Sequence, residues 1–253
     1  MKTKLALKLF LFYLSLIVIA EVVTSFIDPS YGLFLHAMIL VSLLTLAAFW
    51  HGKKPVSGML QSLSLAPLIR ILSLSIPLTY LPQYTWYVAA GIPVLGAAVI
   101  MIRIQGLSLK DVGLTLRKPI TQVCIALTGI FFGTVEYLIL KPAPLDLGLS
   151  MVGYVLLALA LIIATGFVEE LVFRGILQKS AVNNLGQKTG IISVTAVFAA
   201  LHIGWLSLLD VVFVFLIGLF FAVSVLKTGS IIGVTLSHGI TNVFLFIVMS
   251  LLQ

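Results

Sequence analysis

Charged residues and cysteines are scarce in this sequence. Of its 253 residues, 9% are charged and one, Cys124, is a cysteine. A single cysteine cannot form an intrachain disulfide, which excludes a disulfide-stabilised scaffold. Soluble domains ordinarily contain about a quarter of charged residues. The scarcity of charge therefore excludes a soluble protein.

Clusters of basic residues are also lacking. The net charge is +7, but no more than two Lys or Arg residues are adjacent anywhere in the chain. The basic residues stand instead at the ends of apolar runs, as the topology of a membrane protein requires. We therefore expect no nucleic-acid partner.

Long apolar runs dominate what is present. The chain is 61% hydrophobic, and runs of about 20 apolar residues, each long enough to cross a bilayer, recur along it. The run at 59–80 contains Pro67, Arg70 and Pro77 and is the weakest. The sequence predicts an all-α polytopic transmembrane bundle of eight or nine spans, a single membrane domain over residues 1–253 surrounded by lipid bilayer. The runs lie at 5–27, 31–50, 59–80, 86–105, 119–140, 149–180, 189–205, 207–226 and 230–251.

Positive charge is concentrated in every second loop. Cytoplasmic loops of membrane proteins carry an excess of Lys and Arg, so with nine spans the pattern predicts a cytoplasmic N-terminus and an external C-terminus. The basic residues of these segments are Lys2, Lys4, Lys8, Lys53, Lys54, Arg103, Lys110, Arg117, Lys118, Lys179, Lys188 and Lys227.

Five ionisable residues lie in the spans without forming a wider pattern. They are Glu21, His36, Arg70, Glu136 and Asp210. Such residues are costly inside a membrane and are candidates for function, but for the first four we expect pairing between helices or snorkelling to the interface. Asp210 is expected to reach water near the outer end of its span.

The segment GFVEELVFRGIL, residues 166–177, places three charges in an apolar run. Glu170 and Arg174 are four residues apart, so they are neighbours on one helix face and can form an ion pair. Glu169 is rotated by about 100° from Glu170, so the two carboxylates need not share one role.

Two later runs carry further polar residues at a matching depth. A rise of about 1.5 Å per residue from the cytoplasmic helix ends places Glu169 about 15 Å and His202 about 21 Å into the membrane. The same estimate places His238 at about 12 Å and Asn242 at about 18 Å, on one face of their helix. This agreement between three helices predicts a single site.

The residue types in this site suit hydrolysis by activated water. Two histidines and a carboxylate can activate water, either directly or on a metal ion. Asn and His can donate hydrogen bonds to the oxyanion that forms when water attacks an amide. No Ser, Cys or Asp combination lies at a matching depth, so direct hydrolysis is favoured over a covalent nucleophile.

Three motifs in this region resemble those of a known family. EELVFRG resembles the EExxxR motif of the CAAX-protease and bacteriocin-processing (Abi) family of intramembrane proteases, which is related to the type II CAAX prenyl endopeptidase. Phe198 to His202 matches its FxxxH motif, and His238 to Asn242 matches its HxxxN motif. The motifs occur in order across residues 166–242, and LSLKDVGL at 107–114 resembles the amphipathic segment that often precedes that core.

The resemblance implies a role for each matched residue. Glu169 would be the general base, with His202 polarising the attacking water. His238 and Asn242 would stabilise the oxyanion. Glu170 and Arg174 would hold and tune the site, with Phe198 as structural support. The catalytic core would span 119–251.

The resemblance also implies an activity and a location. The protein would be an intramembrane endopeptidase, in a bacterial cell membrane, that cleaves a hydrophobic or membrane-bound peptide. Relatives in eukaryotes remove the last three residues of prenylated proteins, and bacterial relatives are linked to bacteriocin processing, immunity and scaffolding. The alternatives are a non-catalytic immunity or scaffold member and a proton-coupled transporter, although no repeated halves support a transporter.

A metal ion is the remaining alternative for water activation. One Glu and two His could supply three zinc ligands, with water as the fourth. The spacing that places two ligands on one helix, as in HExxH, is missing from the sequence. We therefore favour a site without a metal or other cofactor.

Overall fold

The computed structural model describes residues 2–52, 54–76, 85–142 and 148–252, and every regular element among them is helical. Nine helices in these ranges are long and apolar enough to cross a membrane. The prediction of a polytopic all-α bundle is confirmed, with the larger of the two expected numbers of spans. Pro77 and the end of the predicted run at 59–80 lie outside the described residues.

The first five spans precede the motif-bearing region. They consist of α1 (Lys2–Phe26), α2 (Pro29–Phe49), α3 (Lys54–Leu63) with α4 (Leu65–Ser75), α5 (Trp86–Ile104) and α6 (Pro119–Leu140). Helices α3 and α4 form one span with an interruption at Ser64. Pro67 stands in the first turn of α4, where its missing N–H accounts for the interruption.

The sixth span is a single helix from Met151 to Leu185, 35 residues long. At 1.5 Å per residue it is roughly 52 Å long, well beyond the thickness of a hydrocarbon core. Two π-helical segments interrupt its α-helical geometry. Its parts are α7 (Met151–Ala160), η3 (Leu161–Phe167), α8 (Val168–Glu170), η4 (Leu171–Leu177) and α9 (Gln178–Leu185).

The last three spans complete the bundle. Their parts are α10 (Gln187–Ala200), η5 (Ile203–Trp205), α11 (Leu208–Thr228), α12 (Ile232–Val243), η6 (Phe244–Val248) and α13 (Met249–Leu251). Helix α10 ends before His202, so that residue lies in the turn towards α11 and not within a continuous helix. Ser207 caps α11, since its hydroxyl accepts a hydrogen bond from the Asp210 amide at 3.2 Å.

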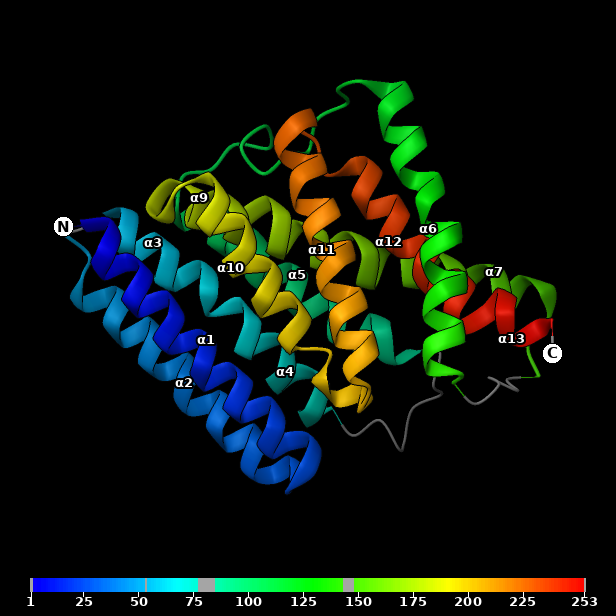
Figure 1. Cartoon of the computed structure of the whole chain (residues 1–253), viewed down its shortest axis with the longest axis horizontal. Helices are drawn as coiled ribbons and strands as arrows, with labels where there is room; N and C mark the ends of the chain where they lie inside the picture. The colour runs from blue at the N-terminus through cyan, green and yellow to red at the C-terminus, as the bar shows by residue number, and fades with distance from the viewer. Residues whose placement is uncertain (1, 53, 77–84, 143–147, 253) are drawn as a thin grey trace.

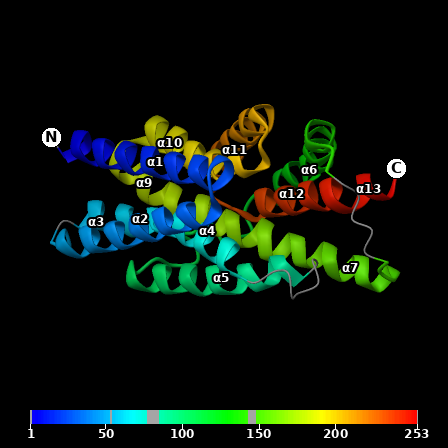
Figure 2. The ribbon, with the colours of Figure 1, turned by 90° about the horizontal axis from the view of Figure 1, so that it is seen from below.

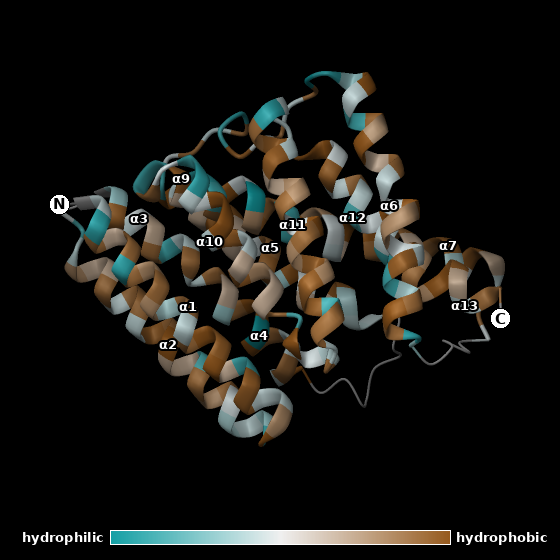
Figure 3. Cartoon of the chain, viewed as in Figure 1, coloured by the Kyte–Doolittle hydropathy of each residue, from teal (hydrophilic) through white to brown (hydrophobic). Residues whose placement is uncertain are grey.

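The helices lie in an elongated arrangement with the two termini at opposite ends (Figure 1). Seen from below, α10 and α11 lie on one side and α5 on the other, with α12 between them (Figure 2). Hydrophobic residues cover most of the helices, while hydrophilic ones gather at helix ends, in loops and around the short helix α9 (Figure 3). Large apolar side chains such as Phe12 and Phe34 are exposed on the outer surface, as lipid contact requires.

Glycines allow α12 to approach two of its neighbours closely. Gly129 and Gly133 of α6 form a GxxxG pair, and a Cβ at either position would collide with the carbonyl oxygens of Ser237 and Thr241. A Cβ at Gly166 of η3 would lie 2.8 Å from the amide nitrogen of Gly239. Close backbone approach through small residues is how membrane helices pack, and here it fixes the helix that carries His238.

The loop between α5 and α6 contacts α9 and the start of α12. Asp111 accepts a hydrogen bond from Lys179 Nζ at 2.6 Å, and this ammonium group holds the pKa of the Asp111 carboxyl well below its usual range. The amide of Ile231, at the start of α12, donates to the carbonyl of Gly113 at 2.9 Å. The segment 107–114 thus ties α9 to the start of α12.

Two predictions about isolated charges have opposite outcomes. Glu21 lies 3.2 Å from Nε2 of His36 and 2.6 Å from Nε of Arg70, which confirms pairing between helices for these three residues. The expectation that Asp210 reaches water is wrong, because it is 0% exposed. Asp210 is directed inward from the first turn of α11, and its carboxylate oxygens have no hydrogen-bond partner in the described part of the chain.

Candidate active site

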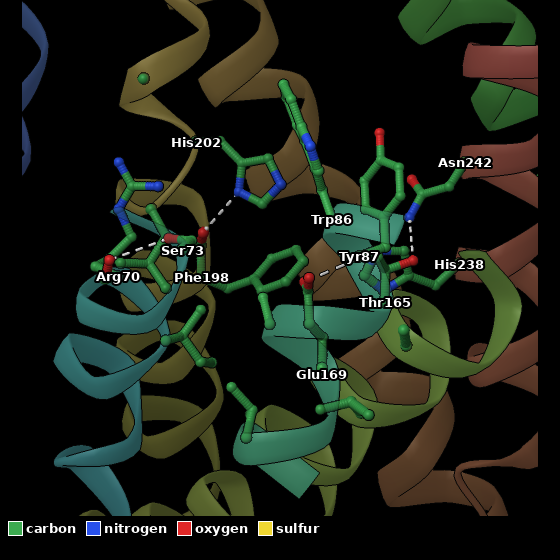
Figure 4. Close-up of a pocket in the computed structure, with 18 of the residues that line it drawn as sticks. Arg70, Ser73, Trp86, Tyr87, Thr165, Glu169, Phe198, His202, His238 and Asn242 are labelled. Atoms are coloured by element: carbon green, nitrogen blue, oxygen red, sulfur yellow. Dashed lines mark hydrogen bonds and ion pairs between the residues drawn. The ribbon is translucent and has the colours of Figure 1, made fainter. Parts of the chain in front are cut away.

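A cavity of about 500 Å³ lies where the motif-bearing helices meet α4 and α5. Glu169, His202, His238 and Asn242 all line it, from three separate spans (Figure 4). The four predicted polar groups therefore share one site, as the matching depths indicated. Glu170 and Arg174 do not line the cavity and lie behind it.

Glu169 and His238 approach each other in the cavity. Oε2 of Glu169 lies 3.9 Å from Nε2 of His238, and the Glu169 side chain is 28% exposed. The separation is too long for a hydrogen bond. It is short enough for one water molecule, at about 2.8 Å from each atom, to bridge the two groups.

The opposite edge of the His238 ring is held by Glu170. Nδ1 of His238 lies 3.0 Å from Oε1 of Glu170, which is 0% exposed. Since a carboxylate accepts hydrogen bonds, Nδ1 carries a proton and donates it in this contact. This fixes the ring orientation and directs Nε2 towards Glu169.

Arg174 balances the charge of Glu170. Its Nη1 donates to Oε1 of Glu170 at 2.8 Å, one helical turn away, and both side chains are buried. The predicted ion pair of these residues is confirmed. The guanidinium carbon also lies 4.2 Å from the ring centroid of Phe198, a cation–π contact.

Phe198 connects the charged pair to both histidines. Its ring centroid lies 4.9 Å from that of His202 and 5.9 Å from that of His238. The ring thus separates the Arg174 guanidinium from the cavity. This position accounts for an aromatic residue four positions before His202.

His202 is oriented by a contact with the last turn of the preceding helix, α10. Nδ1 lies 3.0 Å from the carbonyl oxygen of Phe198, so it carries the proton and donates. In the neutral ring Nε2 is then an acceptor, and it has no hydrogen-bond partner among the residues that the structure describes. Because α10 ends at Ala200, the ring stands at the end of the helix, on the cavity wall.

Asn242 is held by a residue that the sequence did not single out. Its Nδ2 donates to Oγ1 of Thr165 at 2.8 Å, and the Thr165 hydroxyl donates to the carbonyl of Leu161. These contacts orient the amide and leave it one free N–H. Thr165 directly precedes the segment at 166–177, and a polar side chain beside that motif was the available signal.

Other lining residues come from outside the motifs. Arg70 and Glu136 line the cavity, although the sequence favoured a pairing role for both. Glu136 also lines an adjoining chamber of about 30 Å³ together with both histidines. Trp86 and Tyr87 at the start of α5 line the cavity as well, and their apolar run gave no signal of this.

The two adjacent glutamates face different surroundings. Glu169 lines the cavity while Glu170 contacts buried side chains, as their offset on the helix predicted. Both lie in α8, between the π-helical segments η3 and η4. π-Helical turns are frequent at functional sites.

A metal-ligand set is not evident in the geometry. Within residues 2–52, 54–76, 85–142 and 148–252, no group of three His, Cys, Asp or Glu side chains is arranged to hold a metal ion. Glu169 approaches Nε2 of His238. The other ring nitrogen of His238, Nδ1, already contacts Glu170, and Glu170 is paired with Arg174.

Comparison with known families gives one match. Residues 151–244 match the family model described as type II CAAX prenyl endopeptidase Rce1-like. No curated protein and no solved structure matches the chain. The match confirms the resemblance seen in the motifs and covers all seven predicted site residues: Glu169, Glu170, Arg174, Phe198, His202, His238 and Asn242.

Proposed function

The match makes residues 151–244 a member of the type II CAAX prenyl endopeptidase Rce1-like family, and from this premise we propose that the protein is an intramembrane endopeptidase. Its substrate is a hydrophobic or membrane-bound peptide, and its nucleophile is a water molecule activated by Glu169. The observation that supports this proposal most is the 3.9 Å gap between Glu169 and His238 inside the cavity.

Water activation falls to Glu169 and His202. The Glu169 carboxylate accepts a proton from water as its oxygen attacks the peptide carbonyl. The Nε2 lone pair of His202 accepts a hydrogen bond from the same water and helps to orient it. Because the Nδ1 proton of His202 is donated to the Phe198 carbonyl, this acceptor role is open to Nε2.

The oxyanion is stabilised by His238 and Asn242. With Nδ1–H donated to Glu170, a second proton on Nε2 makes His238 an imidazolium whose charge faces the Glu170 carboxylate. Nε2–H and the free N–H of Asn242 donate to the oxyanion. When the C–N bond breaks, the proton on Glu169 passes to the leaving nitrogen, which gives a carboxylic acid and an amine.

This mechanism requires no metal or other cofactor. The N–H groups of His238 and Asn242 stabilise the negative charge of the intermediate. Glu169 transfers the proton from the attacking water to the leaving nitrogen. The core at 119–251 supplies these groups, while α4 and α5 complete the cavity wall. We place the protein in a bacterial cell membrane with its N-terminus in the cytoplasm, following the charge pattern of its loops.

The test is peptide hydrolysis by purified protein in detergent. Glu169→Gln keeps the shape of the side chain but cannot accept the proton, so kcat should fall by about 10²-fold or more. Asp28→Asn is the matched control, because it makes the same change at the N-cap of α2, where Asn caps equally well. An undiminished rate in Glu169→Gln would refute the mechanism.

Two further arms separate the alternatives. Activity should persist with a membrane-permeant chelator, whereas a zinc site would lose activity and regain it with zinc. A non-catalytic immunity or scaffold protein would keep its biological effect in Glu169→Ala, and an endopeptidase would lose it.

A further inference from the structure

Arg70 differs from a purely structural buried cation. It belongs to α4, outside the matched region, and is the one Lys or Arg among the described residues that line the cavity. Its side chain is 18% exposed, whereas those of its partners Glu21 and His36 are 0% exposed. One end of the ion cluster is therefore open to the cavity.

The contact with Glu21 engages only part of the guanidinium. Nε lies 2.6 Å from Oε1 of Glu21, but the alignment is not that of a hydrogen bond. In the residues described, neither Nη1 nor Nη2 has a hydrogen-bond partner. An arginine pairs most strongly with a carboxylate through two parallel N–H donors, and Arg70 still has such donors available.

The surroundings of Glu21 fix the position of this guanidinium. The Glu21 carboxylate comes from α1 and also contacts His36 of α2 at 3.2 Å. Three spans thus converge on a group whose free end meets the cavity. Polar side chains packed behind a binding residue in this way hold it in position for a ligand.

Arg70 lies on one side of the proposed catalytic residues. In Figure 4 it stands beyond His202, whereas Asn242 and His238 lie on the opposite side of Glu169. Arg70 and His202 line the same cavity. Nη2 of Arg70 faces Gly204. A Cβ added at Gly204 would still lie 3.5 Å from this nitrogen, so there is space beside the guanidinium.

The remaining charges of the cavity restrict where an anion can bind. The Glu169 carboxylate also lines the wall, so an anionic ligand is repelled near it and attracted near Arg70. A carboxylate is the anion that peptides carry, and a guanidinium fork matches its geometry.

We propose that Arg70 binds a carboxylate of the peptide substrate while the scissile carbonyl lies at Glu169. The proposal rests on the endopeptidase function proposed above and adds a charge requirement to the substrate. Glu21 and His36 act as positioning residues for the guanidinium. The carboxylate comes either from the C-terminus of the peptide or from an acidic side chain.

The first test needs only the wild-type protein and three matched peptides. One has a free C-terminus, one a C-terminal amide, and one an amide with a Glu side chain next to it. Loss of a charged hydrogen-bonded contact should lower kcat/KM of the neutral peptide by about 10- to 100-fold. Whether the Glu peptide recovers this loss identifies the source of the carboxylate. Equal kcat/KM for all three peptides would overturn the proposal.

The second test removes the guanidinium. In Arg70→Gln the ratio of kcat/KM between the carboxylate peptide and the neutral peptide should shrink to within about threefold. If Glu21 without its partner prevents folding, Glu21→Gln with Arg70→Gln removes both charges together and avoids an unpaired buried carboxylate. Arg103→Gln, an exposed arginine in α5, is the control and should keep the full preference. A variant without Arg70 that keeps the full preference would rule out the assignment.

Binding separates this proposal from the catalytic one. Trp86 and Trp205 line the cavity, so their fluorescence reports peptide binding to the Glu169→Gln variant. Preferential binding of carboxylate peptides without hydrolysis by wild type would retain Arg70 as the anion site and reject the endopeptidase. Hydrolysis by the wild type without any preference for carboxylate peptides would retain the endopeptidase and reject Arg70 as the anion site. A third outcome is that anionic lipids inhibit the wild type but not Arg70→Gln, while the peptides show no preference. This outcome would assign the site to lipid phosphate and reject the proposal.

Discussion

The carboxylate of Glu170 and the imidazole of His238 are in direct contact, at 3.0 Å, although they lie 68 positions apart in the chain. Arg174 contacts the same oxygen of Glu170 at 2.8 Å. The imidazole of His238, the carboxylate of Glu170 and the guanidinium of Arg174 thus form a row, with Nε2 of His238 on the side of Glu169.

Glu170→Gln should reduce turnover more than substrate binding. The neutral amide cannot balance the positive charge of the His238 imidazolium, so the doubly protonated ring that donates Nε2–H to the oxyanion would be less populated. By analogy with other carboxylate–histidine pairs, kcat should fall by at least about 10²-fold with KM little changed. Steady-state kinetics measures this, and an effect on KM alone would show that Glu170 does not act through His238.

Arg174→Ala should destabilise the protein. Glu170 would become an uncompensated buried charge, which costs about 3–5 kcal/mol when a buried pair is broken from one side. The folded yield in membranes and the thermal transition in detergent should both fall, and Arg174→Lys should restore part of the loss. An Arg174→Ala protein of full stability but without activity would instead give Arg174 a direct role in the chemistry.

Gly133→Ala should impair the site from a distance. An added methyl would collide with the carbonyl oxygen of Thr241 and push α6 away from α12, at a cost of about 1–3 kcal/mol for overpacking. Both the thermal stability and the peptidase rate should decrease. Gly96→Ala in α5 is the control, because no heavy atom lies within 4 Å of the added Cβ. It should leave the peptidase rate unchanged and should not lower the thermal stability, since alanine favours a helix more than glycine does.

The contact between Asp111 and Lys179 should stabilise its loop in a pH-dependent way. The folded-state pKa of Asp111 is depressed, so the contribution is complete above the unfolded value of about 3.9. It is lost as the pH falls below that value towards the folded-state pKa. Limited proteolysis of the loop at 105–118 should accelerate in this acid range. The Asp111→Asn variant should be cleaved faster than the wild type at neutral pH, and its cleavage rate should not show this acid dependence. A pH profile like that of the wild type would contradict a stabilising contact between Asp111 and Lys179.

The sequence predicted those parts of the structure that follow from hydrophobicity and helical spacing. Apolar length alone predicted the spans, and a spacing of four residues predicted the ion pair of Glu170 and Arg174. Depth along each helix brought Glu169, His202 and His238 to one level. These properties depend on one helix at a time, so a single sequence reveals them.

Properties that depend on the rotation of one helix against another were not predictable. Glu136 and Arg70 were recognised as costly charges, but apolar runs without a polar face do not show which side meets the cavity. Asp210 was assigned to water from its position near a helix end, whereas its side chain lies on the inward face of α11 and is buried. The end of α10 at Ala200 also had no signal, because apolar residues continue past it.

The π-helical segments on either side of α8 bear on how this chain tolerates changes in length. Each π-turn accommodates more residues per turn than an α-helix, in the way that an inserted residue does. Deleting a single residue within Leu161–Phe167 would return that segment to α-helical geometry and leave the residues after it on nearly the same helix face, so Glu169 would still be directed towards His238. Deleting a residue from the regular α-helix α7 would instead rotate the two parts of the helix against each other by about 100°. Changes in the length of this helix should therefore be tolerated within the π-helical segments and not in α7.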